Sequence, residues 1–354
     1  MPSPSLLFFF LFFSFVSPRP IPDGQLQHEE QRLVLQPAHA NNKWGSFHRL
    51  LDLQRGSHVS GLAGLKKYFT RFGYLHKADR AELSSDSFDA RLESAILRYQ
   101  TNLGLPITGR LDAATLAQIM TPRCGVPDSA MRPPNQTGVA ERFTFFSGRP
   151  RWTGSKPLTL TYAISPVRTI DYVSRADVAA ALRRAFARWA RVIPVRFAEA
   201  ADYDAAVVKV GFYAGDHGDG EPFDGVLGIL GHAFSPENGR MHLDAAERWA
   251  VDLGKEASEV AVDLESVLTH EIGHVLGLGH STVKEAVMYP SLSPRTKKVE
   301  LQVDDAEGAQ ALYGSNPDFR LNQLVESETT SRAYRSSIGC SSWIRMAMLM
   351  MLIV

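Results

Sequence analysis

The sequence predicts an α+β fold, in which helices pack on one sheet and a small helical unit comes first. Two observations predict this. Between residues 60 and 120, apolar residues recur at three- and four-residue spacings, which is typical of helices. From Leu158 onward, short alternating stretches are interleaved with helical patterns, which indicates a sheet with helices packed on it.

Three helices are expected in the first unit, whereas residues 20 to 57 show no clear periodicity. The second helix ends at Gly104 with Pro106 beyond it, and the third follows Asp112 as its N-cap. Their apolar faces are Leu62, Leu65, Tyr68, Phe69 and Phe72, then Phe88, Leu92, Ile96, Tyr99 and Leu103, then Leu116, Ile119 and Met120. A unit of about 60 residues is only marginally stable alone. We therefore expect it to pack against another part of the chain.

The second unit begins with a strand. Residues Leu158–Ile164 alternate, and Ser174 with Asp177 then opens a helix whose apolar face includes Val178 and Trp189. Further strands are expected at Val195–Phe197 and Val207–Tyr213, and further helices over 259–277 and from Asp304 to Tyr313, the last closed by Gly314.

Composition excludes several classes of protein. Lys plus Arg and Asp plus Glu both number 38, so the formal net charge is zero. Nucleic-acid binding and polybasic membrane binding both need a cationic excess, so neither is expected. The two cysteines are too few for a disulfide-stapled scaffold.

The two ends of the chain carry targeting signals. The Leu/Phe run from Leu6 to Val16 is too short to span a bilayer and predicts a secretory signal peptide over residues 1–19, although no Lys or Arg precedes it. A buried core segment is the alternative. Residues 338–354 resemble a GPI-attachment signal, but the tail is short and Arg345 interrupts it. A disordered apolar tail is the alternative there.

The stretch after the third helix predicts an exposed linker. It follows Pro122–Asp128 and contains Pro133 and Pro134. The sequon that starts at Asn135 is a candidate N-glycan site in a secreted chain.

One short segment predicts a catalytic zinc site. His270 and His274 lie four residues apart on an expected helix, and Gly277 and Gly279 let the chain turn and return His280 as a third ligand. Three imidazoles around Zn²⁺ leave a fourth position for water, whose pKa the metal lowers. Glu271 is placed to take that water's proton. Histidines on a helix surface are the alternative reading of a lone His-x-x-x-His, but they do not account for all five motif positions together.

At Met288, eight residues after His280, the chain resembles the matrix metalloproteinases, or matrixins, within the metzincins. Ser281 directly after the third histidine favours matrixins over astacins and adamalysins. The resemblance implies a metzincin-type catalytic domain, with a twisted, mostly parallel sheet and three helices, and a Met-turn at Met288. It covers roughly residues 60 to 316, and Gly-Asp-Gly-Glu-Pro-Phe-Asp-Gly at 218–225 is closest to the plant branch. Only 40 residues follow Gly314, which implies a short member without a hemopexin domain.

Pro122–Asp128 resembles the family's cysteine switch. A thiolate is a stronger zinc ligand than water, so Cys124 in the fourth position would block hydrolysis. A spare thiol, or a disulfide with Cys340, is the alternative. The three helices resemble the peptidoglycan-binding-like prodomain of matrixins, with Gly104–Gly109 matching its turn. The expected domains are a propeptide at 20–142, a catalytic domain at 143–316 and a linker at 317–337, with activation by a protease that cuts before Phe143.

A second group of residues predicts structural ions. His217, Asp219, His232 and His242 fit a closed structural zinc site. Asp224, Asp244 and Glu247 are hard oxygen donors that suit Ca²⁺, with an acidic solvated loop as the alternative. The resemblance implies the same roles and adds the carbonyls of Gly225, Leu227 and Ile229 as calcium ligands. The prediction is two zinc ions and at least one calcium ion per chain, while Val207 and Arg240 depart from the family's further calcium sites.

The predicted function is a secreted zinc endopeptidase, made as a latent zymogen. Its partners would be an activating protease and extended extracellular polypeptides, which add a strand to the sheet edge and place an apolar side chain beside the zinc helix. Neither nucleic acid nor membrane is expected as a partner, except through a GPI anchor on the outer face of the plasma membrane. The rivals are a wall- or matrix-binding protein with structural zinc only and a non-peptidase zinc hydrolase; Gly277 and Met288 argue against the second.

Overall fold

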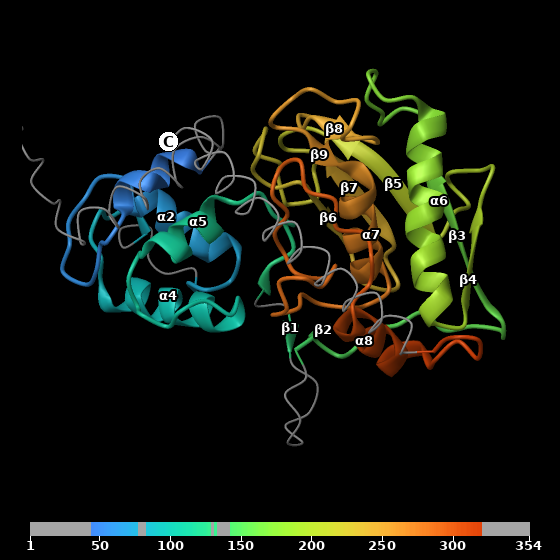
Figure 1. The fold of residues 1–354 in the computed structure, drawn as a ribbon, viewed down its shortest axis with the longest axis horizontal. Helices are drawn as coiled ribbons and strands as arrows, with labels where there is room; N and C mark the ends of the chain where they lie inside the picture. Colours follow the sequence, from blue (N-terminus) through green and yellow to red (C-terminus); the bar gives the residue numbers. More distant parts are fainter. Residues whose placement is uncertain (1–43, 77–82, 129–130, 133–141, 321–354) are drawn as a thin grey trace, which may run out of the picture.

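The computed structural model describes residues 44–76, 83–128, 131–132 and 142–320. A helical unit and a larger unit with a sheet lie side by side (Figure 1). No helix in these described segments combines the length and apolarity needed to cross a membrane. The predicted signal peptide, Asn135, Cys340 and the C-terminal tail lie outside the described residues.

The three predicted helices of the first unit are present. They are α2 (Leu62–Arg71), α4 (Ala90–Asn102) and α5 (Ala113–Met120). Asp112 caps α5 as expected, because its side chain accepts a hydrogen bond from Thr115 N at 2.8 Å. The 3-10 helix η1 (Gly45–Leu50) was not predicted, because so short an element shows no 3.6-residue periodicity.

The helical unit packs on the larger one, as its size predicted. Its core continues into Phe223, Ile229 and Tyr289, which belong to the second unit. Tyr289 also donates a hydrogen bond to Gln118 Oε1 at 2.9 Å. The two units therefore share apolar surface that neither would bury alone.

The sheet is mostly parallel. Its strands are β3 (Leu158–Ile164), β4 (Val195–Glu199), β5 (Val208–Tyr213), β6 (Gly231–Ala233) and β7 (Arg240–Asp244). The order is β4-β3-β5-β7-β6, so β6 lies at one edge of the sheet. The pair of β6 and β7 is antiparallel, and the other pairs of this sheet are parallel. The described residues also form two small two-stranded sheets. In one, β1 (Met131–Arg132) pairs with β2 (Phe145–Phe146), and in the other, β8 (Trp249–Ala250) pairs with β9 (Val262–Asp263).

Three helices accompany the sheet: α6 (Arg175–Val192), α7 (Leu264–Val275) and α8 (Val303–Tyr313). Ser174 caps α6 and Gly314 follows α8, as predicted. The helix expected over 259–277 is shorter. Asp263 accepts a hydrogen bond from Ser266 N and starts the helix there, after β9 has paired with β8, and Gly277 ends it with a φ of +102°.

The core of the larger unit lies between α7, α6 and the sheet, and it holds α7 in place. Trp189 of α6 is fully buried and donates its indole N–H to Thr269 O of α7 at 2.9 Å. All twelve residues of α7 are buried. A helix held on every side presents its polar side chains at fixed positions.

Candidate active site

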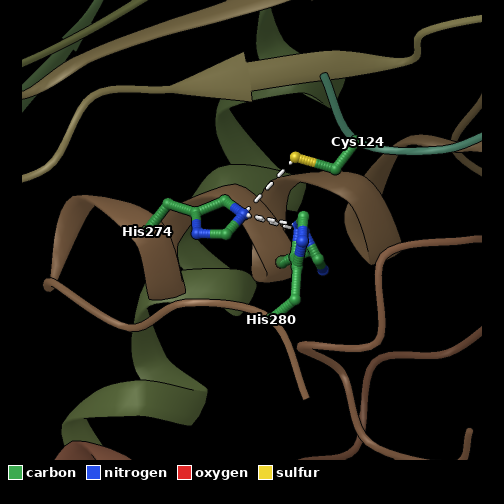
Figure 2. A group of neighbouring side chains, drawn as sticks. Cys124, His274 and His280 are labelled. Atoms are coloured by element: carbon green, nitrogen blue, oxygen red, sulfur yellow. Dashed lines mark hydrogen bonds between the residues drawn. The ribbon is translucent and has the colours of Figure 1, made fainter. Parts of the chain in front are cut away.

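Three histidines converge beside α7. His270 and His274 lie one turn apart on its buried length, and their Nε2 atoms are 3.1 Å apart. Gly277 then turns the chain where a Cβ would overlap Pro150 O, and His280 returns with its Nε2 at 3.2 Å from that of His274. Figure 2 shows His274 and His280 directed at one another. The structure thus brings the three predicted ligands to one point.

The protonation state of the three imidazole rings follows from the contacts of their Nδ1 atoms. Each Nδ1 lies 2.6–2.8 Å from an oxygen that accepts hydrogen bonds: Val287 O for His270, Leu278 O for His274 and Asp128 Oδ1 for His280. Burial also lowers the pKa of all three imidazoles, which keeps them neutral. Each Nδ1 therefore carries the proton, and three Nε2 lone pairs face one another.

Lone pairs at this spacing repel unless a cation lies between them. The Sγ of Cys124 adds a fourth donor at 3.4 Å from His274 Nε2 (Figure 2). The four ligand atoms all lie within 4.8 Å of one another. Nitrogen and sulfur donors in a group of four are the set that zinc prefers, so the residues present fit a zinc ion.

Glu271 lies next to this group and is fully buried. Neither carboxylate oxygen has an N–H or O–H partner among the described residues, and the thiol of Cys124 faces them. Burial raises the pKa of Glu271 to about 8, while the neighbouring Cys124 thiol acts in the opposite direction. A carboxylate that stays buried without a partner is suited to exchange protons with a group bound at the site.

The segment that carries Cys124 crosses the site in an extended form. Cys124 N donates to Pro290 O at 2.8 Å on one side, and Gly125 N donates to Gly231 O of β6 at 2.8 Å on the other. A Cβ on Gly125 would lie only 2.7 Å from Ile229 Cγ2, so the close approach depends on glycine. In the described part of the chain Cys124 is a free, buried thiol.

Asp128 links this segment to the histidines, and the sequence interpretation gave it no role. It pairs with the buried guanidinium of Arg123 at 2.8 Å, accepts from Tyr74 Oη at 2.6 Å and accepts from His280 Nδ1. Burial alone would raise the pKa of Asp128, but Arg123 and His280 hold it well below its usual range. No spacing along the chain indicates this contact, since 152 residues separate Asp128 from His280.

The comparisons with known proteins agree with this geometry. A family model described as matrixin matches residues 151–314, and one described as a putative peptidoglycan binding domain matches residues 60–119. The chain is 58% identical over 291 residues to metalloendoproteinase 1-MMP of Arabidopsis thaliana, covering 82% of this chain and 79% of the relative. The chain belongs to the matrixin family.

Further relatives extend over most of this matrixin. Metalloendoproteinase 1 of Glycine max is 44% identical over 79% of this chain and 91% of its own. Human matrix metalloproteinase-20 is 34% identical over 75% of this chain and 50% of its own. The matrixin assignment makes the protein a zinc metalloendopeptidase, and it confirms the predicted α+β fold with its preceding helical unit.

A second group of donors in the matrixin lies around Asp219. Its Oδ2 is within 2.7–2.8 Å of His217 Nε2, His232 Nε2 and His242 Nδ1. His232 and His242 are partners across β6 and β7, while the loop between β5 and β6 supplies His217 and Asp219. Burial lowers the pKa of His232 and of His242 to about 4, so both rings are neutral and each has a nitrogen lone pair that can ligate a metal ion. These four residues could hold an ion, and they fit zinc with no position open.

The predicted calcium donors surround the loop at 224–229. Each of the three carboxylates accepts a backbone N–H of that loop: Ile229 N to Asp224 Oδ1 (2.7 Å), Gly225 N to Asp244 Oδ2 (3.1 Å) and Gly228 N to Glu247 Oε1 (3.3 Å). Burial raises the pKa of Glu247 to about 8, and among the described residues no side-chain or backbone group bonds its buried Oε2. Leu227 has a φ of +57°, so this loop is held in an uncommon form. Gathered carboxylates of this kind suit a hard cation.

Met288 packs against α7, the helix that carries His270 and His274. It is 1% exposed, and a Cβ on Gly273 of α7 would overlap its Sδ, so the sulfur packs directly on the helix. Asp305 of α8 fixes this turn because Oδ1 accepts from Met288 N and Oδ2 from Val287 N, both at 2.9 Å. The sequence interpretation missed Asp305, since an aspartate at the start of a helix is ordinarily a capping residue.

Proposed function

We propose that this matrixin is a secreted zymogen whose propeptide blocks a zinc endopeptidase site. The observation that carries the proposal is the position of Cys124. Its Sγ lies beside the Nε2 of His274, and its thiol faces Glu271, where a bound water would otherwise stand. A site whose zinc is only structural would not need the buried carboxylate of Glu271 beside the fourth ligand.

His270, His274 and His280 would hold the catalytic zinc, with Cys124 as the fourth ligand in the latent form. When bound, zinc supplies a Lewis acid that acidifies a water molecule and polarises the substrate carbonyl. Glu271 takes the proton of that water and passes it to the leaving amine. The buried, unpartnered state of its carboxylate supports this role.

Extended polypeptides would bind along β6. It is an edge strand, and Gly125 of the propeptide already donates a hydrogen bond to Gly231 O there. A substrate that replaces the segment around Cys124 would add a strand in the same place. An adjoining pocket beside α7 would take one side chain.

A peptide library tests the proposed activity directly. We expect the activated, zinc-loaded protein to cleave extended peptides within the chain, and a zinc chelator to abolish the cleavage. Mass spectrometry of the products gives the cleaved bonds. Cleavage that survives removal of all zinc, or no cleavage of any peptide by the zinc-loaded enzyme, contradicts the proposal.

Two further ions are part of the proposal. His217, Asp219, His232 and His242 would hold a structural zinc, giving two zinc ions per chain. Calcium would bind Asp224, Asp244 and Glu247 together with the carbonyls of Gly225, Leu227 and Ile229. The raised pKa of Glu247 supports a cation, because a bound ion would relieve the cost of burying that charge.

Replacement of His232 tests the structural zinc. We expect His232→Ala to lower the zinc content from two to one per chain and to lower the melting temperature by several degrees, because the other donors would lose a partner. Metal analysis and calorimetry measure both. His48→Ala, in the helical unit, serves as the control and should retain two zinc ions. Two zinc ions in His232→Ala would contradict the assignment.

The remaining proposals concern processing and location. We place a signal peptide at 1–19, a propeptide at 20–142, the catalytic domain at 143–316, a linker at 317–337 and a GPI-attachment signal at 338–354. Asn135 would carry a glycan, and a protease that cuts before Phe143 would activate the enzyme outside the cell. Extracellular substrates are consistent with the names of relatives such as interstitial collagenase of Oryctolagus cuniculus.

A further inference from the structure

The pocket beside α7 has mostly apolar walls and one cationic side chain. It adjoins His270 and Glu271, and Lys298 is the lysine among the residues that line it. The apolar part of the wall comes from Leu230, Val267, Val287 and Leu292. An aliphatic side chain in the pocket would pack on these apolar residues but would form no hydrogen bond with Lys298.

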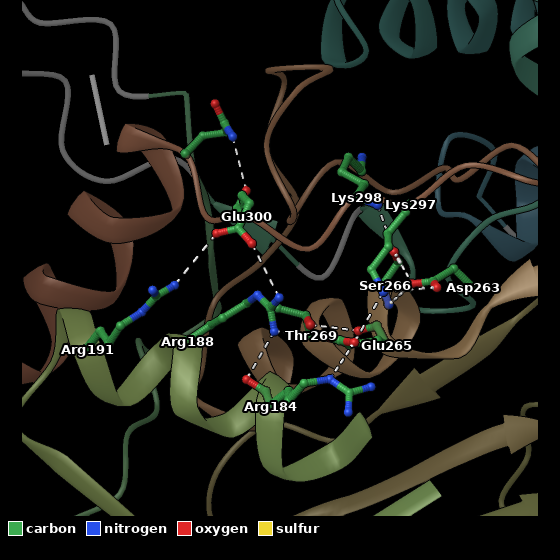
Figure 3. A network of polar contacts seen from close by, with 11 residues as sticks. Arg184, Arg188, Arg191, Asp263, Glu265, Ser266, Thr269, Lys297, Lys298 and Glu300 are labelled. Atoms are coloured by element: carbon green, nitrogen blue, oxygen red, sulfur yellow. Dashed lines mark hydrogen bonds and ion pairs between the residues drawn. The ribbon is translucent and has the colours of Figure 1, made fainter. Parts of the chain in front are cut away.

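The position of Lys298 is fixed by the start of the zinc-binding helix. Its backbone N–H donates to Ser266 Oγ at 2.7 Å, and Ser266 Oγ donates to Asp263 Oδ1 at 2.6 Å. Figure 3 shows Lys298 beside Ser266 and Asp263. Asp263 also caps α7, so the same contacts set the start of the helix and the place of Lys298 in the wall.

The ammonium of Lys298 is poorly satisfied. Its Nζ lies 3.4 Å from Lys284 O and 3.5 Å from Ser291 O, well beyond the usual 2.9–3.0 Å for such a bond. It also lies 5.3 Å from the centroid of the Tyr289 ring, so among the residues that the structure describes its partners are an aromatic face and two distant carbonyls, with no oxygen at close range. None of the ion pairs formed within the described segments involves Lys298, whereas the adjacent Lys297 pairs with Asp263 and Glu265.

The carboxylates that face Lys298 do not compensate for this. Asp305 and Glu285 are the acidic groups that act on it. Both oxygens of Asp305 accept backbone N–H groups at 287, 288 and 302, and Glu285 is an exposed residue. A half-buried ammonium without a close acceptor gains free energy when a ligand brings one.

We propose that Lys298 selects substrates in which the side chain that enters this pocket is long and ends in an acceptor oxygen, as those of glutamine and glutamate do. The methylene stem packs on the apolar walls, and the terminal oxygen accepts from Lys298 Nζ. A methionine of similar length offers no oxygen acceptor there. The inference rests on the proposed endopeptidase function and adds the preference of its pocket.

Three peptides that differ only in the residue that enters the pocket test the preference. They carry glutamine, glutamate or methionine, and kcat/KM is measured with the full-length chain, zinc-loaded and then activated by limited proteolysis. We expect the wild-type enzyme to prefer glutamine to methionine. Lys298→Met should lower the glutamine-to-methionine ratio by about tenfold, because one hydrogen bond to a charged group is lost.

Two further variants provide the controls. Lys297→Met, with its charge in ion pairs outside the pocket, should keep the wild-type ratio, and Lys298→Arg should keep a preference for acceptors. An unchanged ratio in Lys298→Met, or a wild-type enzyme that prefers methionine to both other residues, overturns the proposal. Chelator-sensitive cleavage of the methionine peptide by the wild-type enzyme reports the endopeptidase itself, so a failure of the proposed function is distinguished from a failure of this preference.

Discussion

Replacing Glu271 by alanine should lower kcat/KM for peptide cleavage by about 10²- to 10⁴-fold, the range for a lost general base. The carboxylate is fully buried, and its oxygens have no partner in the described structure that could take over the proton transfer. The zinc content should stay unchanged, because the ligand atoms belong to the three histidines. Kinetics with a fluorogenic peptide, together with metal analysis, measure the two effects separately.

Glu271→Gln is the matched control because it keeps the size of the side chain and removes only its ability to take a proton. It should lose activity to a similar degree, while the melting temperature stays at or above that of the wild type, since a buried charge without a partner is costly. If either variant cleaved peptides within tenfold of the wild-type rate, Glu271 would not be the base.

The convergence of the three histidines could be predicted because its geometry is local. His270 and His274 are one helical turn apart, and Gly277 is the residue at which the chain turns and brings His280 back to them. The contact between Asp128 and His280 could not be predicted in this way. It depends on how the segment around Cys124 packs against the larger unit, and the periodicity of a sequence does not report packing between distant segments.

The strands also differ in how far the local sequence predicts them. Leu158–Ile164 was predicted with its observed bounds because alternation along the strand matches one buried face. β6 and β7 are three and five residues long, and they carry His232 and His242 where the pattern of a strand would place ordinary core residues. Both strands carry residues that could hold an ion, so the alternation of apolar and polar residues that predicts a strand is weak in them.

Replacing Cys124 by serine should give a full-length chain that cleaves peptides without activation and trims its own propeptide. A hydroxyl is a much weaker zinc ligand than a thiolate, so we expect activity about two orders of magnitude above that of the wild-type zymogen. Peptide cleavage by the freshly purified chain, and its mass over time, measure this. Cys340→Ser, the replacement of the other cysteine, is the matched control and should stay latent.

The size of this effect depends on what else holds the segment. Cys124 N and Gly125 N would still donate to Pro290 O and Gly231 O, and the buried pair of Arg123 and Asp128 would remain. These contacts position the segment, but without the thiolate they leave the fourth position open to water. Activity should therefore rise before the propeptide is cut. A Cys124→Ser chain as latent as the wild type at saturating zinc would show that the backbone contacts alone block the site.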